Sequence, residues 1–259
     1  AAAAVLRKYK EGKAVLDKRI VSNEQWWKMR HWAEIGYEPD DTRPQPASAW
    51  LFNSIANKHA DAMDNIPEPS VLPREQGDEE CARQLSLLLP AVLERCGFEK
   101  LYSDGWWYKL KNGTACQAVV WDPALEDGRG DIAIRNVDIL NLFWQPGIKE
   151  LEESANLFYV SLVDKEQLRE MYPGLKDGIS EETVNVEKYR TDDRTDDSGK
   201  AEVVDWYYKK TAGGKKILHY CRFCGDKVLY SSEDDESCKD GFYSHGRYPF
   251  VIDPLFTQE

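Results

Sequence analysis

The spacing of apolar residues changes along the chain. In the first part, apolar residues recur at intervals of three and four, which is typical of amphipathic helices. We therefore expect helices over residues 5–35, 47–65 and 78–96. Within the first range, Ser22 and Gln25 have the spacing of a capping pair, so a second helix could begin there.

The helix expected over residues 78–96 contains a proline. Pro90 lacks the backbone N–H that a helix interior uses, so a kink or a break is expected near Leu89. Gly97 is suited to end this helix, because glycine readily adopts a left-handed conformation. The apolar side that the helix is expected to bury consists of Leu85, Leu88, Leu89, Val92 and Leu93.

From residue 106 the apolar spacing becomes two, which indicates β-strands. Residues 106–111 and 115–121 have the pattern of two such strands. The pair Asn112-Gly113 between them favours a two-residue turn of type I′, in which both residues have positive φ. The sequence therefore predicts a β-hairpin over residues 106–121.

The remaining sequence alternates short strand-like runs with turns. Strands are expected over 131–137, 157–163, 202–209, 215–221 and 227–230, with a short helix over 165–171, a polar loop over 190–200, and turns at Gly213-Gly214 and Gly225-Asp226. Helices first and antiparallel strands later predict an α+β fold. Four parts are expected in chain order: a helical segment over residues 1–73, an α+β domain over 74–188, a flexible acidic loop over 189–200 and a β-rich meander over 201–259.

The composition describes an acidic chain with enough apolar residues for a core. Apolar residues make up 42% of the 259 residues, and the net charge is -12. Holding a phosphate backbone requires clustered Lys and Arg, so this balance disfavours a tight nucleic-acid binder. It permits nucleic acid to pass nearby, because repulsion suits a channel that must not retain its cargo. No signal peptide and no apolar run of roughly 20 residues is recognised, and the six cysteines are expected to be free thiols.

One spacing suggests a metal site, the pair Cys221-Arg-Phe-Cys224. Zinc takes four ligands, usually as two such pairs, and only Cys238 and His245 follow downstream. On one strand the two cysteines would point in different directions, unless the turn at Gly225 brings them together. A zinc site and ordinary thiols both remain open.

No arrangement of residues points to catalysis. The histidines are His31, His59, His219 and His245, and none of them stands in a His-Glu-x-x-His pattern. No nucleophile elbow and no phosphate-binding loop occurs. We therefore predict no catalytic residue, no cofactor-binding residue and no metal ligand, and a protein that is not an enzyme. The aromatic clusters Trp26-Trp27, Trp106-Trp107 and Trp206-Tyr207-Tyr208 suit core packing or subunit contacts.

Several stretches, taken in chain order, resemble one family. They are residues 19–32 (RIVSNEQWWKMRHW), 49–64 (AWLFNSIANKHADAMD), 138–147 (DILNLFWQPG), 218–226 (LHYCRFCGD) and 248–256 (YPFVIDPLF). These stretches are similar to portal proteins from phages and prophages of Gram-positive bacteria. None is a catalytic motif, so the resemblance rests on collinear similarity over most of the chain.

The resemblance implies a structural subunit of a ring, commonly of twelve copies, at the head vertex through which DNA is packaged and ejected. The implied partners are further copies of the chain, the major capsid and scaffolding proteins, the terminase motor, the head-tail connector and double-stranded DNA that passes without sequence-specific binding. No membrane is implied, and the location would be the virion and, during assembly, the host cytoplasm. The chain would be the N-terminal and wing part, with residues 74–188 as the wing-like domain and the stem and clip missing after Glu259.

Two other functions are compatible with the sequence. A zinc-binding enzyme or nuclease would use Cys221 and Cys224, and metal analysis of the purified protein would reveal it. A soluble acidic adaptor for another protein would need only a well-solvated surface.

Overall fold

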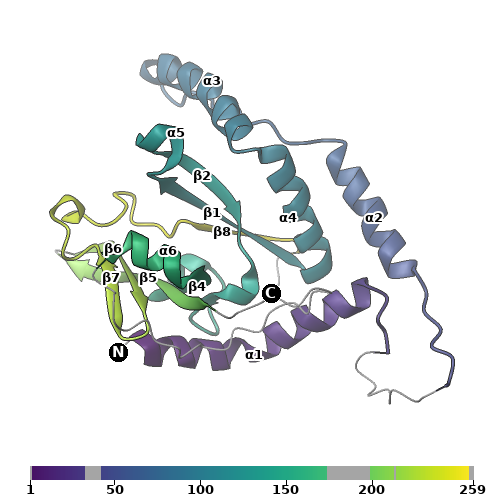
Figure 1. Cartoon of the computed structure of the whole chain (residues 1–259). Coiled ribbons are helices and arrows are strands. Elements are labelled where there is room, and N and C mark those ends of the chain that lie inside the picture. The colour runs from purple at the N-terminus through teal and green to yellow at the C-terminus, as the bar shows by residue number, and fades with distance from the viewer. Residues whose placement is uncertain (1, 33–41, 174–198, 213, 257–259) are drawn as a thin grey trace. The chain divides into compact units, whose positions relative to one another are not determined.

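The computed structural model describes residues 2–32, 42–173, 199–212 and 214–256 (Figure 1). The chain forms two compact units. Unit 1 comprises Ala1–Ser22 and Asp138–Tyr248, and unit 2 comprises Asn23–Val137 and Pro249–Glu259. Helices dominate the first part of the chain and antiparallel sheets the second, which confirms the α+β class.

Unit 1 is built on a five-stranded antiparallel sheet with the order β3-β4-β5-β6-β7. The strands are β3 (Leu142–Trp144), β4 (Asn156–Asp164), β5 (Lys200–Ala212), β6 (Lys215–Cys224) and β7 (Lys227–Ser231). Helix α6 (Lys165–Met171) follows β4, and short 3-10 helices occur at Ile139–Asn141, Leu151–Glu153 and Glu236–Cys238. The side chain of Asp164 accepts a hydrogen bond from the backbone N–H of Glu166, and this N-cap begins α6 directly at the end of β4.

Helix α1 (Ala2–Trp27) packs one side against the sheet of unit 1. Leu6 and Tyr9 lie in a buried cluster with Phe143, Phe158 and Val204. Side chains three and four residues apart share a helix face, so this contact follows from the periodicity. The expected helix over residues 5–35 is a single helix that ends at Trp27, and the expected second helix at Ser22 is wrong.

Unit 2 combines three helices with a three-stranded antiparallel sheet of order β2-β1-β8. The helices are α2 (Trp50–Met63), α3 (Glu79–Arg95) and α4 (Phe98–Asn112), with a 3-10 turn at Gln76–Asp78 and the short α5 at Leu125–Gly128. The strands are β1 (Thr114–Asp122), β2 (Asp131–Asn136) and β8 (Phe250–Pro254). Strand β8 comes from the far end of the sequence and pairs with β1, which makes β1 the central strand.

The predicted hairpin over residues 106–121 is wrong in its first half. Residues 98–112 form α4, and only the second expected strand exists, as β1. Gly113 has φ of 83° and caps α4, with its N–H bonded to the carbonyl of Lys109 at 2.8 Å. Left-handed glycine serves both a type I′ turn and a helix C-terminus, so the Asn-Gly pair could not distinguish them.

Helix α3 differs from its prediction chiefly in the residues that it buries. The helix is continuous through Pro90, so a break near Leu89 is wrong. The expected buried side is only partly buried. Leu85 is 40% and Leu88 54% accessible, Leu89 and Leu93 are half-buried, and Val92 is buried. The expected stop at Gly97 is confirmed by its φ of 65° between α3 and α4.

The other expected elements are confirmed within one to three residues at most ends. Strands β2, β4, β5, β6 and β7 and helices α2 and α6 occur where alternation or helical spacing predicted them. Gly214 and Gly225 have positive φ at the two expected turns, whereas Gly213 and most of the expected loop over 190–200 lie outside the described residues. None of the described helices is long and apolar enough to cross a membrane.

Candidate interaction surfaces

The aromatic residues of unit 2 form a stack between its helices. Trp27 lies 4.7 Å from Phe52 and 5.3 Å from Trp107, measured between ring centroids. Trp107 in turn stacks on His59 at 4.0 Å, and the Nε2 of His59 lies 3.0 Å from the hydroxyl of Ser103. These contacts join the end of α1 to α2 and α4, so His59, Trp27 and Trp107 serve packing here.

Unit 1 contains a partly buried ion pair beside the aromatic ring of Tyr220. Asp205 on β5 and Arg222 on β6 face each other, with Nε and Oδ1 2.6 Å apart and a second bond at 3.1 Å. The hydroxyl of Tyr220 donates to the same carboxylate at 2.5 Å. Burial, reinforced by the charge of Asp205, raises the pKa of Tyr220. Three groups from two strands thus satisfy one another, as a buried charge requires.

A second buried charge fastens α1 to unit 1. Lys13 is 6% exposed, with its amino group 2.8 Å from the carboxylate of Asp17 and 4.6 Å from the ring centroid of Phe143. It also donates to the carbonyl oxygen of Ile139. Burial lowers the pKa of Lys13, and the charge of Asp17 opposes that shift. The pair fixes this part of α1 against unit 1.

The structure does not bring the candidate zinc ligands into one cluster. Cys224 lies in an apolar cluster that includes Leu168, and burial raises the pKa of both the Cys221 and Cys224 thiols. Cys238 lies 3.7 Å from a tyrosine hydroxyl, and His245 stacks on a tyrosine ring. A metal-binding cysteine is a thiolate, so raised pKa values disfavour that role. Across the described ranges, no three His, Cys, Asp or Glu side chains are arranged to hold a metal ion.

The remaining candidate histidines have separate surroundings. His31 packs on Trp26 at a centroid distance of 4.7 Å. His219 lies 3.4 Å from the hydroxyl of Ser232. With His59 and His245 already placed, the four histidines lie in four different local environments, which supplies no shared catalytic or ligand set.

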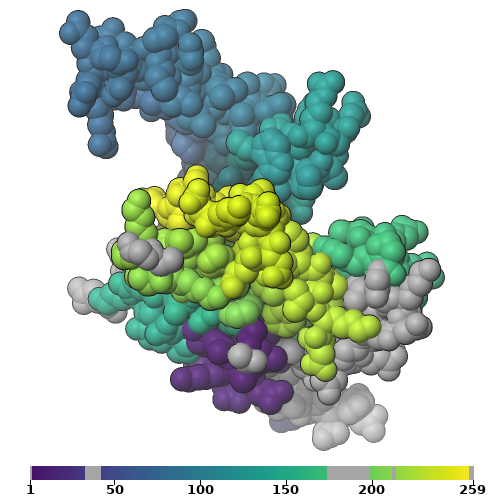
Figure 2. Space-filling view, turned by 90° about the vertical axis from the view of Figure 1, so that its left-hand side faces the viewer, coloured from purple at the N-terminus to yellow at the C-terminus, as the bar shows by residue number. Residues whose placement is uncertain are grey.

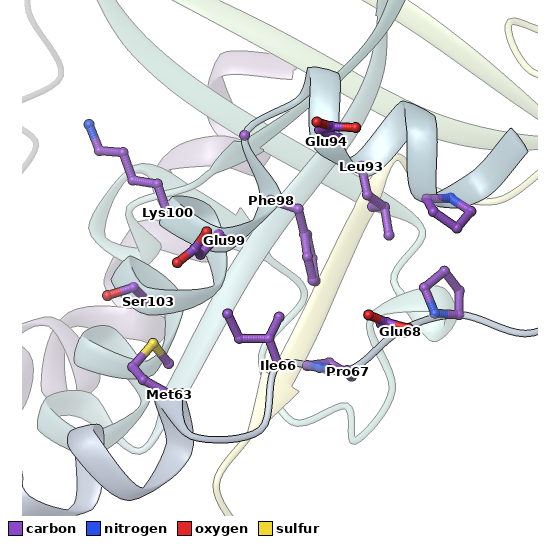
Figure 3. A pocket seen from close by; sticks show the side chains of 13 residues that line it. Met63, Ile66, Pro67, Glu68, Leu93, Glu94, Phe98, Glu99, Lys100 and Ser103 are labelled. Carbon is purple, nitrogen blue, oxygen red and sulfur yellow. The ribbon is translucent and has the colours of Figure 1, made fainter.

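Unit 2 contains an open groove with a cavity volume of about 870 Å³. It lies where the segment after α2, the end of α3 and the start of α4 meet, and Figure 3 shows its side chains. Ile66, Leu93 and Phe98 point toward one another across its floor. Further lining residues are Met63, three prolines (Pro67, Pro69 and Pro90), Gly97 and Ser103.

Charged side chains line the edge of this groove. Glu68, Glu94 and Glu99 supply three carboxylates, and Lys100 supplies one amino group that points away from the floor in Figure 3. None of the three carboxylates pairs with a cation among the described residues. The groove therefore offers an apolar floor with a negatively charged edge, a combination that suits apolar and basic side chains.

Sequence reasoning missed this groove, because its lining comes from three separate segments. The local signals are only Pro67, Pro69 and Pro73, which favour an extended segment after α2. No periodicity indicates that this segment lies beside the junction of two helices. The groove is thus a product of tertiary packing within unit 2.

The comparison with known families gives a match to a phage family. The model of the family described as phage P22-like portal protein matches residues 54–241. This range includes most of both units. No curated protein matches the chain.

Proposed function

Because the chain belongs to the phage P22-like portal protein family, we propose that it is a subunit of the portal ring through which DNA enters and leaves a bacteriophage head. Proteins of this family are structural components of the virion, not enzymes, and act as oligomeric rings in DNA packaging. The match over residues 54–241 is the observation that carries the proposal.

The finer features of the proposal come from the resemblance seen in the sequence. The ring has twelve copies, assembles in the host cytoplasm, and contacts capsid and scaffolding proteins, the terminase motor and the head-tail connector. The chain supplies the N-terminal and wing part, with residues 74–188 as the wing-like domain. A Gram-positive host belongs to the same proposal.

Two physical properties support this role. The net charge of -12 opposes retention of DNA, which a channel must let slide. On α3, Leu85, Leu87 and Leu88 are exposed by 40%, 67% and 54%, and adjacent apolar side chains of this kind are commonly covered by a partner. Both properties suit a subunit that acts within an assembly.

Negative-stain electron microscopy of the protein, expressed from its complete coding sequence, tests the proposal. Rings with a central hole are expected, since one face of each copy meets a different face of the next and the rotation closes. Class averages would give the number of copies. A protein that stays monomeric at every concentration would refute the portal function, and a compact closed dimer would favour the adaptor.

A further inference from the structure

The outward side of α1 carries unpaired cations. With 100° of rotation per residue, they fall within one arc of about 120°, and they extend about 18 Å along the helix axis. They are Arg7, Lys8, Lys18 and Arg19, all exposed, and none of them pairs with an anion among the described residues. We call this surface the basic face of α1. Figure 2 shows the beginning of α1, in purple, at the molecular surface.

The basic face also contains an apolar side chain. Val15 lies in the same arc and is 81% exposed. Glu11 is the acidic residue in this arc, so the face carries four positive charges and one negative charge. The stems of Lys and Arg are aliphatic and can cover apolar surface while their charged ends stay solvated. The basic face therefore has an apolar side chain, Val15, between two pairs of cations along the helix.

The groove of unit 2 has the complementary arrangement. Its floor is apolar through Ile66, Leu93 and Phe98, and its edge carries the unpaired carboxylates of Glu68 and Glu94 together with that of Glu99. A helix that lies in such a groove buries its central apolar side chain and places its basic ends against the carboxylates. The apolar floor of the groove thus matches Val15 of the basic face, and the carboxylates at its edge match the cations.

We infer that the basic face of α1 in one copy docks in the groove of unit 2 in the next copy. This inference rests on the proposed ring function, because a ring needs two different surfaces that fit each other. It goes further by assigning those surfaces to named residues. Val15 lies over the groove floor, and Lys18 and Arg19 face Glu68 and Glu94.

Charge favours a second copy over nucleic acid as the partner of α1. The chain as a whole carries -12, so it repels a polyanion, and four cations are few against a duplex with one charge per about 1.7 Å. The same net charge makes copies repel one another. A local attraction between opposite charges would offset this repulsion and would set the orientation of neighbouring copies.

Charge reversal in the protein expressed from its complete coding sequence tests the contact. One variant carries Lys18→Glu with Arg19→Glu, and a second carries Glu68→Lys with Glu94→Lys. Each is expected to weaken self-association by about tenfold or more, because like charges then face each other. A variant with all four changes restores opposite charges and should regain association to within about threefold of wild type. Sedimentation velocity over a concentration series provides the constants.

Two further variants separate the contact from general effects. Val15→Ser should weaken association by about threefold to tenfold without lowering the melting temperature, since this side chain is exposed in the separate chain. Lys215→Glu with Lys216→Glu makes the same charge change at exposed positions of β6 and should leave association unchanged.

Four outcomes would overturn the inference. Wild-type association that neither pair of reversals weakens would remove the contact but leave the ring function intact. If both pairs of reversals weakened association but the variant with all four changes did not regain it, the inference would also be refuted. If the α1 reversal instead abolished binding of a labelled DNA duplex and left self-association unchanged, the basic face would serve phosphates. A wild-type protein that never associates would refute both the contact and the proposed function.

Discussion

Individual buried charges in unit 1 are each held by several partners. Asp205 accepts two bonds from Arg222 and one from Tyr220, and Lys13 has a carboxylate, a carbonyl and an aromatic ring around it. A buried charge that loses a partner retains its desolvation penalty, so removal of one member is costly. These residues are therefore sensitive sites, although they have no chemical role in the proposed function.

Replacement of Tyr220 by phenylalanine tests the Asp205 network. The change removes a hydrogen bond to a buried carboxylate, and we expect the free energy of unfolding to fall by about 1.5–3 kcal/mol in urea titrations at neutral pH. Tyr102→Phe is the matched control, because the hydroxyl of Tyr102 bonds no described residue. An equal loss in the two variants would contradict a stabilising role for the network.

The same residue gives a pH dependence. Burial and the charge of Asp205 raise the pKa of Tyr220 above its ordinary value of 10.0 in the folded protein. Above pH 10.0 the unfolded chain releases this proton while the folded chain keeps it, so stability falls as the pH rises. In Tyr220→Phe this contribution to the alkaline loss of stability should disappear. Unchanged alkaline slopes in urea titrations would contradict the shift.

At the scale of elements, prediction succeeded where a single short segment determines the structure. Strands β5, β6 and β7 follow one another with tight turns, so alternation and glycine positions are sufficient to locate them. Residues 106–111 of α4 were predicted as a strand because their aromatic residues, such as Trp106 and Trp107, occur in strands as well as in helices. The contacts that stabilise it as a helix, such as Trp107 with Trp27 and His59, come from distant segments.

Gly113 at the end of α4 provides a test of that correction. Its φ of 83° is strained for a β-branched residue, and no neighbouring atom lies where a Cβ would stand. Gly113→Val should therefore destabilise the protein by about 1–2 kcal/mol through backbone strain alone. Gly77→Val, at a position with the same open space and no positive φ, should cost less in the same chemical denaturation. Equal costs would refute the left-handed cap.

At the scale of the molecule, both units join segments that lie far apart in sequence. In unit 2, β8 pairs with β1, and Lys109 of α4 lies 2.5 Å from Asp253 of β8. The N–H of Leu255 also bonds the carbonyl of Gly113 at 2.8 Å. The family match ends at residue 241, so these last contacts extend beyond the matched range.

Truncation of the chain after Tyr248 removes β8 and tests whether its pairing with β1 stabilises the sheet. Without β8, strand β1 becomes an edge in a two-stranded sheet, which is marginal in water. Hydrogen exchange should then accelerate at the β1 amides that pair with β8, from Thr114 to Ala118. A chain shortened only by residues 257–259 is the reference. Unchanged protection of these amides would show that β8 is dispensable for the sheet.

The candidate surfaces also belong to the scale of the molecule. The cations of α1 are visible in the sequence, and a helical projection predicts that they share one side. Their lack of ionic partners, and the groove with its unpaired carboxylates, depend on which segments pack beside them. The sequence could therefore indicate a basic helix, while a complementary surface became visible only in the folded chain.

The sequence by itself determined the family resemblance, the α+β class and the local elements, because collinear similarity, alternation and turn residues are properties of neighbouring positions. Only the tertiary structure decided that residues 98–112 are helical, that Leu85, Leu87 and Leu88 of α3 are exposed and that β8 completes the sheet of β1. The reason is physical: an apolar side chain is buried only where a distant segment covers it, and no local pattern specifies that segment.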